Sequence, residues 1–310
     1  AMKARGRAYI RAARRLDMPE GEVPPARRPT PAPPSEMRPK KYAVTEIQRL
    51  IRDPYAIYAK RILQLDALDP LSPTPDARLK GVVFHNIFEH FFAVDADFSD
   101  RDAAYQRLLS IAFSELDKHV PWAETRVHWW GQMSSIFETL FDAETERRAE
   151  TTQLARERKG YYPVPGTPFR ITGKADRIDR GEDGLIIYDY KTGSVPSAKD
   201  VDHFDRQLVI EAVMAEAGAF KDLPPETVSK VVHLGLGRHP SERITQLVKD
   251  NETVTVLEHL KELLFKFDDP STGYIARRAM DSVRYEGDYD HLSRFGEWDE
   301  SARTDPEPME

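Results

Sequence analysis

Two aspartates lie inside the two segments of this chain that are most strand-like. The stretch ITGKADRIDRGEDGLIIYDYKTG, residues 171–193, has two apolar runs around a turn-like RGEDG, with Asp176 in the first run and Asp189 in the second. If the turn is centred between residues 182 and 183, an antiparallel hairpin places the two aspartates directly opposite each other, with Cβ atoms about 5 Å apart. Two carboxylates at this separation repel each other, and burial adds to the cost. A positive charge must therefore lie between them.

Two sources of that charge are open. Lys191 lies two residues after Asp189 and so on the same face of its strand, where it would form a structural salt bridge. Alternatively, two carboxylates and water form a hard-oxygen site suited to Mg²⁺ or Mn²⁺. Lys191 would then stabilise charge on a phosphate. Periodicity alone leaves both interpretations open, and the Lys-Thr-Gly turn that ends the strand favours the metal.

Helical periodicity precedes strand periodicity along the chain. Apolar spacing predicts helices over 44–63 and 77–93 and two more before residue 150, with Thr45 as an N-cap and a break at Pro54. Residues 151–191 predict three strands. A helix over 199–220, two short strands and a last helix follow. We expect an α/β (α+β) fold with a central mixed sheet flanked by helices and an extra N-terminal helical region.

Four motifs, taken in order, resemble the PD-(D/E)XK nuclease superfamily, and its RecB-type branch in particular. They are GVVFHNIFEHF with His85, GKADRID with Asp176, YDYK with Asp189 and Lys191, and DRQLVIEA with Gln207. The resemblance implies a restriction-endonuclease-like core and a Mg²⁺-dependent deoxyribonuclease, in which Mn²⁺ can substitute and exonuclease action is expected. Four elements in the family order make this match specific.

The resemblance also implies roles for single residues. His85, Asp176 and Asp189 would be metal ligands, with the Tyr190 carbonyl as a further one. Asp176, Asp189, Lys191 and Gln207 would be catalytic. On residue type alone, a histidine on such a helix is more often a core or rim residue, and Gln207 is equally well a solvent-facing glutamine. Asp179, three residues after Asp176, is assigned to structure.

A narrower resemblance concerns residues 44–71, VTEIQRLIRDPYAIYAKRILQLDALDPL. They are similar to the beginning of the C-terminal nuclease domain of AddB-type subunits. This implies a fragment of a longer helicase–nuclease that acts in double-strand break repair and recombination. Its partners would be an AddA-type helicase–nuclease subunit and a single DNA strand fed from a duplex end. Where many such domains carry an iron–sulfur cysteine, this chain has Asp53, and where their Q-L motif ends in tyrosine it has Glu211. With no cluster, packing and polar contacts must hold the ends of the domain together.

The domain boundaries follow from composition. Residues 1–41 are typical of the end of an upstream region followed by a Pro-rich linker, in which Arg27 and Arg28 are exposed. Residues 42–296 form the nuclease domain, divided into a helical part (42–150) with the histidine motif and a sheet core with closing helices (151–296). Residues 297–310 are typical of an acidic, flexible tail.

Bulk composition excludes several other classes. The chain has no cysteine, so disulfides, thiolate zinc sites and Cys-ligated iron–sulfur clusters are excluded, and a reducing cytoplasm fits. No apolar run approaches the length of a membrane span, and no signal peptide opens the chain, so we expect a soluble protein with no membrane contact. The net charge of −7 means that DNA contact needs a local basic patch. Arg147–Arg148 and Arg156–Arg158–Lys159 are candidates, although such runs are usually solvated faces.

Two rival functions remain from the sequence. The domain could keep the nuclease fold and serve as a catalytically weak module that binds a DNA strand or docks the partner subunit. Opposed acids argue against this, because a scaffold does not need them. A metalloprotease or phosphatase has little support, since HExxH, GxSxG and Gly-Lys-Ser/Thr motifs are missing. Strand polarity and the choice between exo- and endonuclease action stay open.

Overall fold

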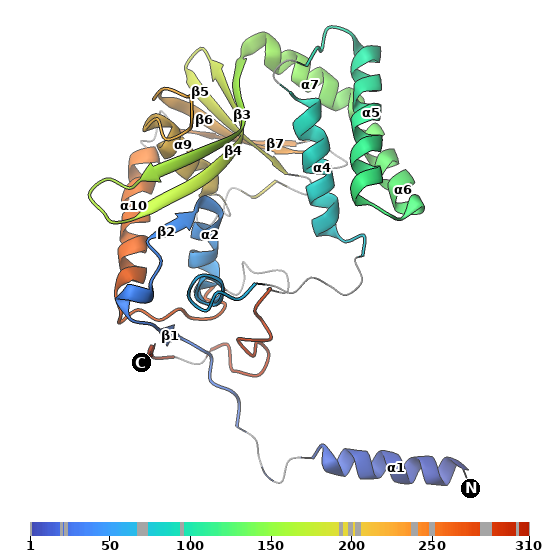
Figure 1. Cartoon of the computed structure of the whole chain (residues 1–310), viewed down its shortest axis with the longest axis vertical. Helices are drawn as coiled ribbons and strands as arrows, with labels where there is room; N and C mark the ends of the chain where they lie inside the picture. The colour runs from blue at the N-terminus through green and yellow to red at the C-terminus, as the bar shows by residue number, and fades with distance from the viewer. Residues whose placement is uncertain are drawn as a thin grey trace.

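A mixed β-sheet with helices on both faces forms the body of the protein (Figure 1). The computed structural model describes residues 2–18, 21, 24–66, 74–93, 96–191, 195–197, 201, 206–236, 241–247, 252–279, 287–301 and 304–309. The predicted fold class is confirmed. The turn predicted at 192–193 and most of the first turns of the helix predicted over 199–220 lie outside the described residues.

The sheet has six strands in the order β2-β4-β5-β6-β7, with β3 also paired to β4. β2 runs parallel to β4 and β5 runs parallel to β6, whereas the other pairs are antiparallel. β2, which has only three residues, was not predicted from the sequence. The strands are β2 (Lys41–Ala43), β3 (Thr152–Pro163), β4 (Arg170–Gly181), β5 (Gly184–Lys191), β6 (Val228–Gly235) and β7 (Ser241–Gln246).

The β4–β5 hairpin has the predicted register. Arg177 pairs with Tyr188 and Ile178 pairs with Ile187. The ladder ends at Arg177 and Tyr188, one residue short of Asp176 and Asp189, so the direct pairing of the two aspartates stays a prediction. The hairpin is held in place because its apolar side chains are buried on both faces of the sheet, as in strands covered on both sides by helices.

The helices fall into two groups, one on each face of the sheet (Figure 1). Thr45 is not the N-cap: the first helix of the domain begins at Val44, and the backbone N–H of Ala43 donates to Glu46 Oε2 at 2.9 Å. The break at Pro54 is confirmed, since α3 begins there. One group is α4 (Ala77–Phe91), α5 (Arg101–His119), α6 (Ala123–Ser134) and α7 (Phe137–Glu150); the other is α2 (Val44–Arg52), α9 (Gln207–Glu216) and α10 (Glu252–Asp268), with α3 (Pro54–Ile57) and a π-helical turn (Tyr58–Ile62) after α2.

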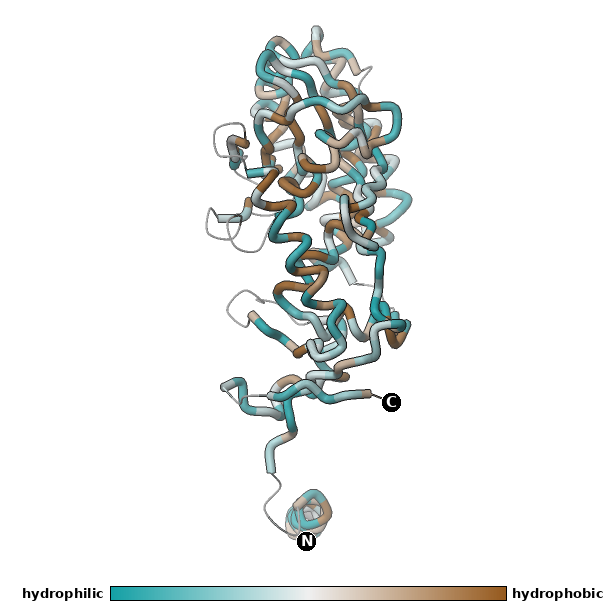
Figure 2. Tube along the Cα trace, turned by 90° about the vertical axis from the view of Figure 1, so that its left-hand side faces the viewer, coloured by the Kyte–Doolittle hydropathy of each residue, from teal (hydrophilic) through white to brown (hydrophobic). Residues whose placement is uncertain are grey.

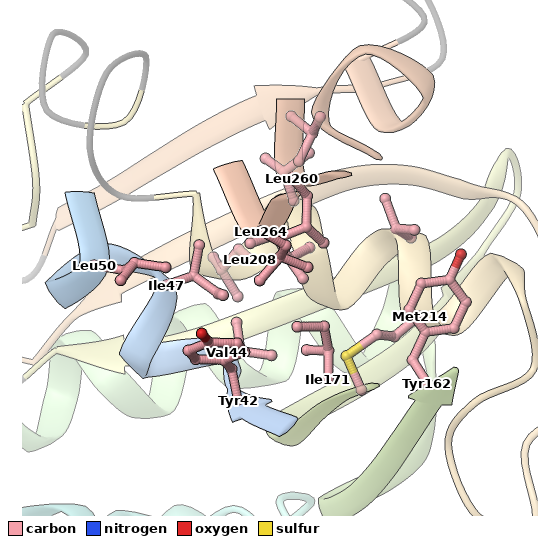
Figure 3. Packing of buried hydrophobic residues seen from close by; sticks show 14 of the residues in the cluster. Tyr42, Val44, Ile47, Leu50, Tyr162, Ile171, Leu208, Met214, Leu260 and Leu264 are labelled. Carbon is pink, nitrogen blue, oxygen red and sulfur yellow. The ribbon is translucent and has the colours of Figure 1, made fainter. Parts of the chain in front are cut away.

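A close approach of α9 to the sheet shapes the core beneath it (Figure 3). Gly160 and Gly173 pair with each other across β3 and β4 and face Met214 of α9. A Cβ on Gly160 would lie 2.7 Å from Met214 Cε and 2.8 Å from the Phe220 ring, so these side chains or the strand would have to shift. The two glycines therefore allow α9 to lie directly on the strands that carry the candidate site.

The segment that contains Arg28 and β1 packs against residues near the C-terminus, which corrects two expectations. Arg28 is buried: its Nε donates to the Ala276 carbonyl at 2.8 Å, and its guanidinium lies over the Trp298 ring. β1 (Pro31–Ala32) pairs with β8 (Glu307–Pro308). Parts of the segments predicted as an exposed linker and a flexible tail thus pack against the domain. Extended proline-rich backbone still has carbonyl groups that accept hydrogen bonds, as those of Pro29 and Pro31 do from the N–H groups of Ala276 and Tyr274. Arg27 is exposed, as predicted.

A second set of polar contacts joins Asp53, Arg277 and Asp290, in a domain where the missing iron–sulfur cluster led us to expect packing and polar contacts to hold the ends together. Asp53 Oδ1 accepts the backbone N–H of Arg277 at 2.8 Å. The Arg277 guanidinium in turn binds Asp290 through Nε at 2.8 Å and through a second nitrogen. Burial raises the pKa of Asp53, and the contacts with Arg277 oppose that rise. The expectation that polar contacts hold the ends together is confirmed.

The helix α1 (Met2–Leu16) lies apart from this body (Figures 1 and 2). Its side chains from Lys3 onward are exposed, whereas apolar segments of the chain concentrate within the body (Figure 2). A short 3-10 turn, Ser35–Met37, precedes β2. Within the described part of the chain, every helix is too short or too polar to cross a bilayer.

Candidate metal centre

The candidate site lies where β4 and β5 part. β4 pairs with β2 at residues 170–172 and with β5 at residues 177–181. Just before the β5 ladder begins, the side chain of Asp176 replaces a backbone partner: its Oδ2 accepts the Tyr190 N–H at 3.0 Å. The predicted aspartate is therefore fixed at the strand junction by a backbone donor, with its remaining oxygen lone pairs available.

Three side chains converge at this junction. His85 Nε2 lies 3.4 Å from Asp176 Oδ2 and 3.6 Å from Glu157 Oε1. One ligand atom from each of the three residues lies within 4.8 Å of the others. All three side chains are largely buried yet not sealed, with exposed fractions of 14–27%. An imidazole and two carboxylates in this arrangement fit a divalent cation such as Mg²⁺ or Mn²⁺.

Glu157 is the member of this group that sequence reasoning missed. It lies on β3, where Arg156 pairs with Arg177 and Arg158 pairs with Ala175, so it stands opposite Asp176. Its φ of +50° is unusual for a non-glycine residue and marks a local distortion of the strand. The signal available in the sequence was the pairing of segments 152–163 and 170–181, which places position 157 beside position 176.

His85 is positioned by the apolar face of α4. Its neighbours Phe84, Ile87 and Phe88 are buried in the core. Their packing fixes the rotation of α4 and turns His85 toward the junction. The hydrogen bond to Asp176 raises the pKa of His85, and burial opposes that rise. A metal ion bound at this nitrogen would therefore compete with a proton, and acid should weaken metal binding.

Asp189 and Lys191 lie on the neighbouring strand, as predicted on one face. Lys191 Nζ is 2.8 Å from Asp189 Oδ2, and Asp189 is buried. Asp189 also pairs across the parallel ladder with His233 of β6, which is buried as well. Among the described residues, the tight three-residue group contains Asp176 and not Asp189. The structure thus brings His85 and Asp176 into direct contact, while a shared ion with Asp189 stays a prediction.

The remaining two predicted residues contact other groups. Gln207 Nε2 donates to Glu211 Oε1 at 3.1 Å on the next turn of α9. The Tyr190 ring packs on Phe92 with centroids 5.6 Å apart, so only the backbone of Tyr190 faces the junction. The roles of the Gln207 amide and the Tyr190 carbonyl stay predictions.

Glu211 is buried where the resemblance leads one to expect a tyrosine. Burial raises its pKa well above the usual value, the bond from Gln207 opposes the rise, and the nearby Asp189 and Asp176 add to it. The folded chain consequently favours the protonated form of this side chain. A neutral carboxylic acid next to two carboxylates avoids a third negative charge.

Replacing Glu211 with glutamine should change the pH dependence of stability. Because the folded pKa is raised, the unfolding free energy of the wild type falls as pH rises above the unfolded pKa of about 4.5 toward the folded value. Glu211→Gln keeps the acceptor for Gln207 and cannot titrate. We expect it to melt higher than the wild type at about pH 8 and to lose this advantage at about pH 5, in thermal unfolding with EDTA. Exposed Glu262→Gln is the control; equal pH profiles for both variants would contradict the assignment.

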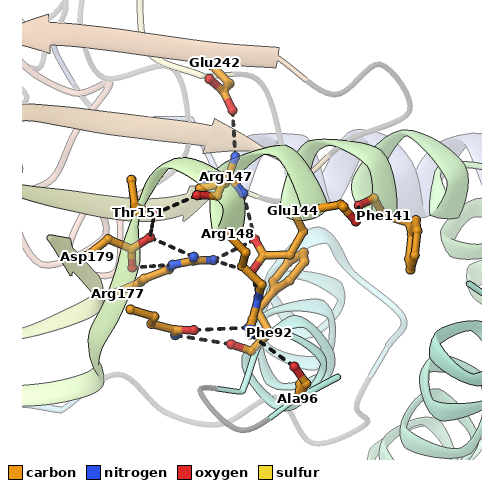
Figure 4. Close-up of polar contacts among 12 residues, drawn as sticks. Phe92, Ala96, Phe141, Glu144, Arg147, Arg148, Thr151, Arg177, Asp179 and Glu242 are labelled. Carbon is orange, nitrogen blue, oxygen red and sulfur yellow. Dashed lines mark hydrogen bonds and ion pairs between the residues drawn. The ribbon is translucent and has the colours of Figure 1, made fainter. Parts of the chain in front are cut away.

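A buried ion-pair network supports β4 from the opposite face (Figure 4). Arg177, fully buried, donates to Asp179 at 2.7 and 2.8 Å and to Glu144 of α7 at 2.7 and 2.9 Å. Thr151 donates to Asp179 at 2.9 Å. Burial alone would raise the pKa of Glu144, but Arg177, Arg147 and Arg148 together oppose it and the net pKa is lowered. The structural role predicted for Asp179 is confirmed.

The segment that carries this site matches a known protein family. The family model of the PD-(D/E)XK nuclease superfamily matches residues 41–284, most of the chain. The chain belongs to the PD-(D/E)XK nuclease superfamily. The matched range begins at β2 and includes the junction of β4 and β5 with all four sequence motifs. The PD-(D/E)XK domain thus supplies the mixed sheet, and its parting strands hold the candidate metal centre.

Relatives of this PD-(D/E)XK chain include two uncharacterised Rickettsia proteins. One, from Rickettsia bellii (strain RML369-C), is 29% identical over 211 residues, which is 67% of this chain and 25% of that protein. The other, from Rickettsia typhi (strain ATCC VR-144 / Wilmington), is 29% identical over 212 residues, 64% of this chain and 24% of that protein. The chain therefore spans about a quarter of the length of these relatives. A solved protein from Eubacterium rectale is similar over 74% of this chain and 81% of its own, with 11% identity and a TM-score of 0.41.

Proposed function

We propose that this domain hydrolyses phosphodiester bonds in DNA with Mg²⁺, and with Mn²⁺ as a substitute. The observation that carries the proposal is the convergence of His85, Glu157 and Asp176 at the strand junction, within 4.8 Å. Membership of the PD-(D/E)XK nuclease superfamily supports it independently.

The residues divide the chemistry between them. His85, Asp176 and Glu157 would hold the ion, with Asp189 and the Tyr190 carbonyl as the further ligands that the motif implies. When bound, a divalent cation polarises a phosphoryl oxygen and lowers the pKa of water. Lys191, held 2.8 Å from Asp189, places an ammonium where charge develops on the phosphate. Gln207 would orient the strand or the attacking water.

The biological setting is a second step of the same proposal. The resemblance of residues 44–71 to AddB-type subunits suggests a helicase–nuclease that processes double-strand breaks for recombination in the cytoplasm. The matched residues make up only about a quarter of these relatives, which fits a domain within such a protein. An AddA-type subunit would be the partner, and the substrate would be a single strand fed from a duplex end, cut as an exonuclease.

The test is metal-dependent cleavage of a 5′-labelled single-stranded oligonucleotide. We expect cleavage with Mg²⁺ or Mn²⁺ and none with EDTA, because the ligand set holds hard divalent ions. Products are resolved on a denaturing gel. Lack of cleavage with either metal would overturn the enzymatic proposal.

The rival interpretation, a nuclease-fold module without catalysis, is separated by thermal unfolding. A metal that binds only the folded state raises the unfolding midpoint in a concentration-dependent way. A Mn²⁺-dependent rise that Glu157→Gln and His85→Ala diminish supports the metal centre. Unchanged midpoints at all Mn²⁺ concentrations would favour the binding module.

A further inference from the structure

One exposed face of the sheet carries cations in a pattern that the candidate metal centre does not use. On the outer parts of β3 and β4, alternate residues face the core, where Tyr162, Ile171 and Ala175 are buried. The residues between them point to the other face, which is open to solvent. This basic face consists of Lys41, Lys159, Tyr161, Arg170, Thr172 and Lys174.

Like charges stand directly opposite each other on this face. Lys159 pairs with Lys174 across β3 and β4, and Arg170 pairs with Lys41 across β4 and β2. Such pairs destabilise a sheet, whereas opposite charges stabilise it. The strand positions between these residues on the same face carry Tyr161, Thr172 and Ala43, and no acid. A chain with a net charge of −7 thus gathers four cations on one face, of which Lys174 is paired with Glu157.

The basic face leads into the metal centre. Lys174 forms an ion pair with Glu157, which lies 3.6 Å from His85. Along β4, Arg170, Thr172, Lys174 and Asp176 follow one another at intervals of about 7 Å, the two-residue rise of a strand. A polymer that lies along β4 would therefore reach the cation ligands at one end of the face.

The aromatic residue on this face indicates the kind of polymer. Tyr161 is 49% exposed, although the next residue of the same strand, Tyr162, is buried. Exposed rings between cations suit single strands, because unpaired bases stack on the ring while phosphates contact the cations. A duplex keeps its bases stacked inside and gains nothing from the ring.

We infer that the basic face is the track along which the phosphate backbone of a single nucleic-acid strand enters the metal centre. Lys41, Lys159 and Arg170 bind successive phosphates, and Tyr161 stacks on a base. The inference rests on the proposed function for its direction, since the strand ends at the candidate scissile position. Binding of the strand to this face does not depend on which metal ion the centre holds.

Binding of a fluorescent single-stranded oligonucleotide, measured by anisotropy in EDTA, tests the track without cleavage. The variant Lys159→Gln/Arg170→Gln should bind more weakly, and the salt exponent of its affinity should shrink by about 0.7 for each phosphate that the variant no longer binds. Tyr161→Ala should bind roughly 5- to 100-fold more weakly with an unchanged salt exponent, because stacking releases no counterions. Lys118→Gln/Lys266→Gln, which removes two exposed lysines from α5 and α10, is the charge-matched control and should bind like the wild type. Wild-type affinity in both the Lys159/Arg170 and the Tyr161 variants would overturn the inference.

Two further measurements separate the inference from the proposed function. Bis(p-nitrophenyl) phosphate is too small to span the face, so the Lys159/Arg170 variant should hydrolyse it at the wild-type rate. If neither protein hydrolyses this diester or DNA, the proposed function fails while the binding result still decides the track. If a poly-glutamate peptide competes as well as an oligonucleotide of equal charge, the face docks an acidic protein and the strand track is wrong. The variant should not melt below the wild type, because it removes like-charge repulsion.

Discussion

The substitution Asp189→Ala should lower metal-dependent DNA cleavage by about 10³-fold or more, since it removes a motif carboxylate and the partner of the neighbouring ammonium. Asp189 is buried and lies 2.8 Å from Lys191. Without it, Lys191 loses the group that fixes its position, and the centre loses negative charge that would attract a cation. Initial rates on single-stranded DNA with Mg²⁺ measure the effect.

The control is Asp183→Ala, which removes an exposed aspartate from the turn of the same hairpin. It changes the net charge equally, and we expect it to cleave at the wild-type rate. Thermal unfolding in EDTA shows whether each variant is folded, and unfolding with Mn²⁺ shows whether metal still stabilises it. A folded Asp189→Ala protein that cleaves at the wild-type rate would contradict both the role of this residue and the proposed function.

The local part of the site could be predicted from the sequence. The hairpin register follows from the turn and from strand periodicity, and the ladder runs as predicted from the pair Gly181 and Gly184 to the pair Arg177 and Tyr188, which is next to Asp176 and Asp189. The side of β5 that carries both Asp189 and Lys191 follows from the two-residue repeat of a strand. These inferences need only contacts within about fifteen residues, where backbone geometry alone sets which side chains meet.

Contacts between distant segments could not be predicted in the same way. Glu157 lies opposite Asp176 in the pairing of β3 with β4, but the strand distortion at that residue, which periodicity does not describe, hides which way its side chain points. Arg28 is buried because Ala276, Arg277 and Trp298 lie against it, contacts across almost the whole chain that composition does not encode. The Pro-rich composition correctly indicated extended backbone but gave no information about what that backbone packs against.

The motif GKADRID contains two aspartates, three residues apart, that point to different faces of the sheet. Asp176 points to the strand junction and meets His85, whereas Asp179 points to the opposite face and meets Arg177. The arginine between them is therefore a structural element of the motif: it anchors β4 to α7 through Glu144. The candidate metal ligand and the anchor of the sheet are thus adjacent residues of one strand.

That anchor predicts a large loss of stability for Arg177→Met. The substitution leaves Asp179 buried with Thr151 as its remaining donor in the network of Figure 4, while Glu144 keeps Arg147 and Arg148. Removal of one partner of a buried ion pair costs about 3–5 kcal/mol, because an uncompensated charge stays in the interior. Urea unfolding followed by circular dichroism measures the free energy of unfolding.

Arg180→Met is the matched control three residues along the same strand. Arg180 binds Glu226 in an exposed ion pair, and such pairs contribute about 1 kcal/mol or less. The double variant Arg177→Met/Asp179→Leu should be more stable than Arg177→Met alone, because it removes the stranded charge together with its former partner. If Arg177→Met costs no more than Arg180→Met, the network does not hold β4 in place. If the cost is large and the double variant recovers none of it, the loss comes from packing against Tyr188 and α7 rather than from the buried charge.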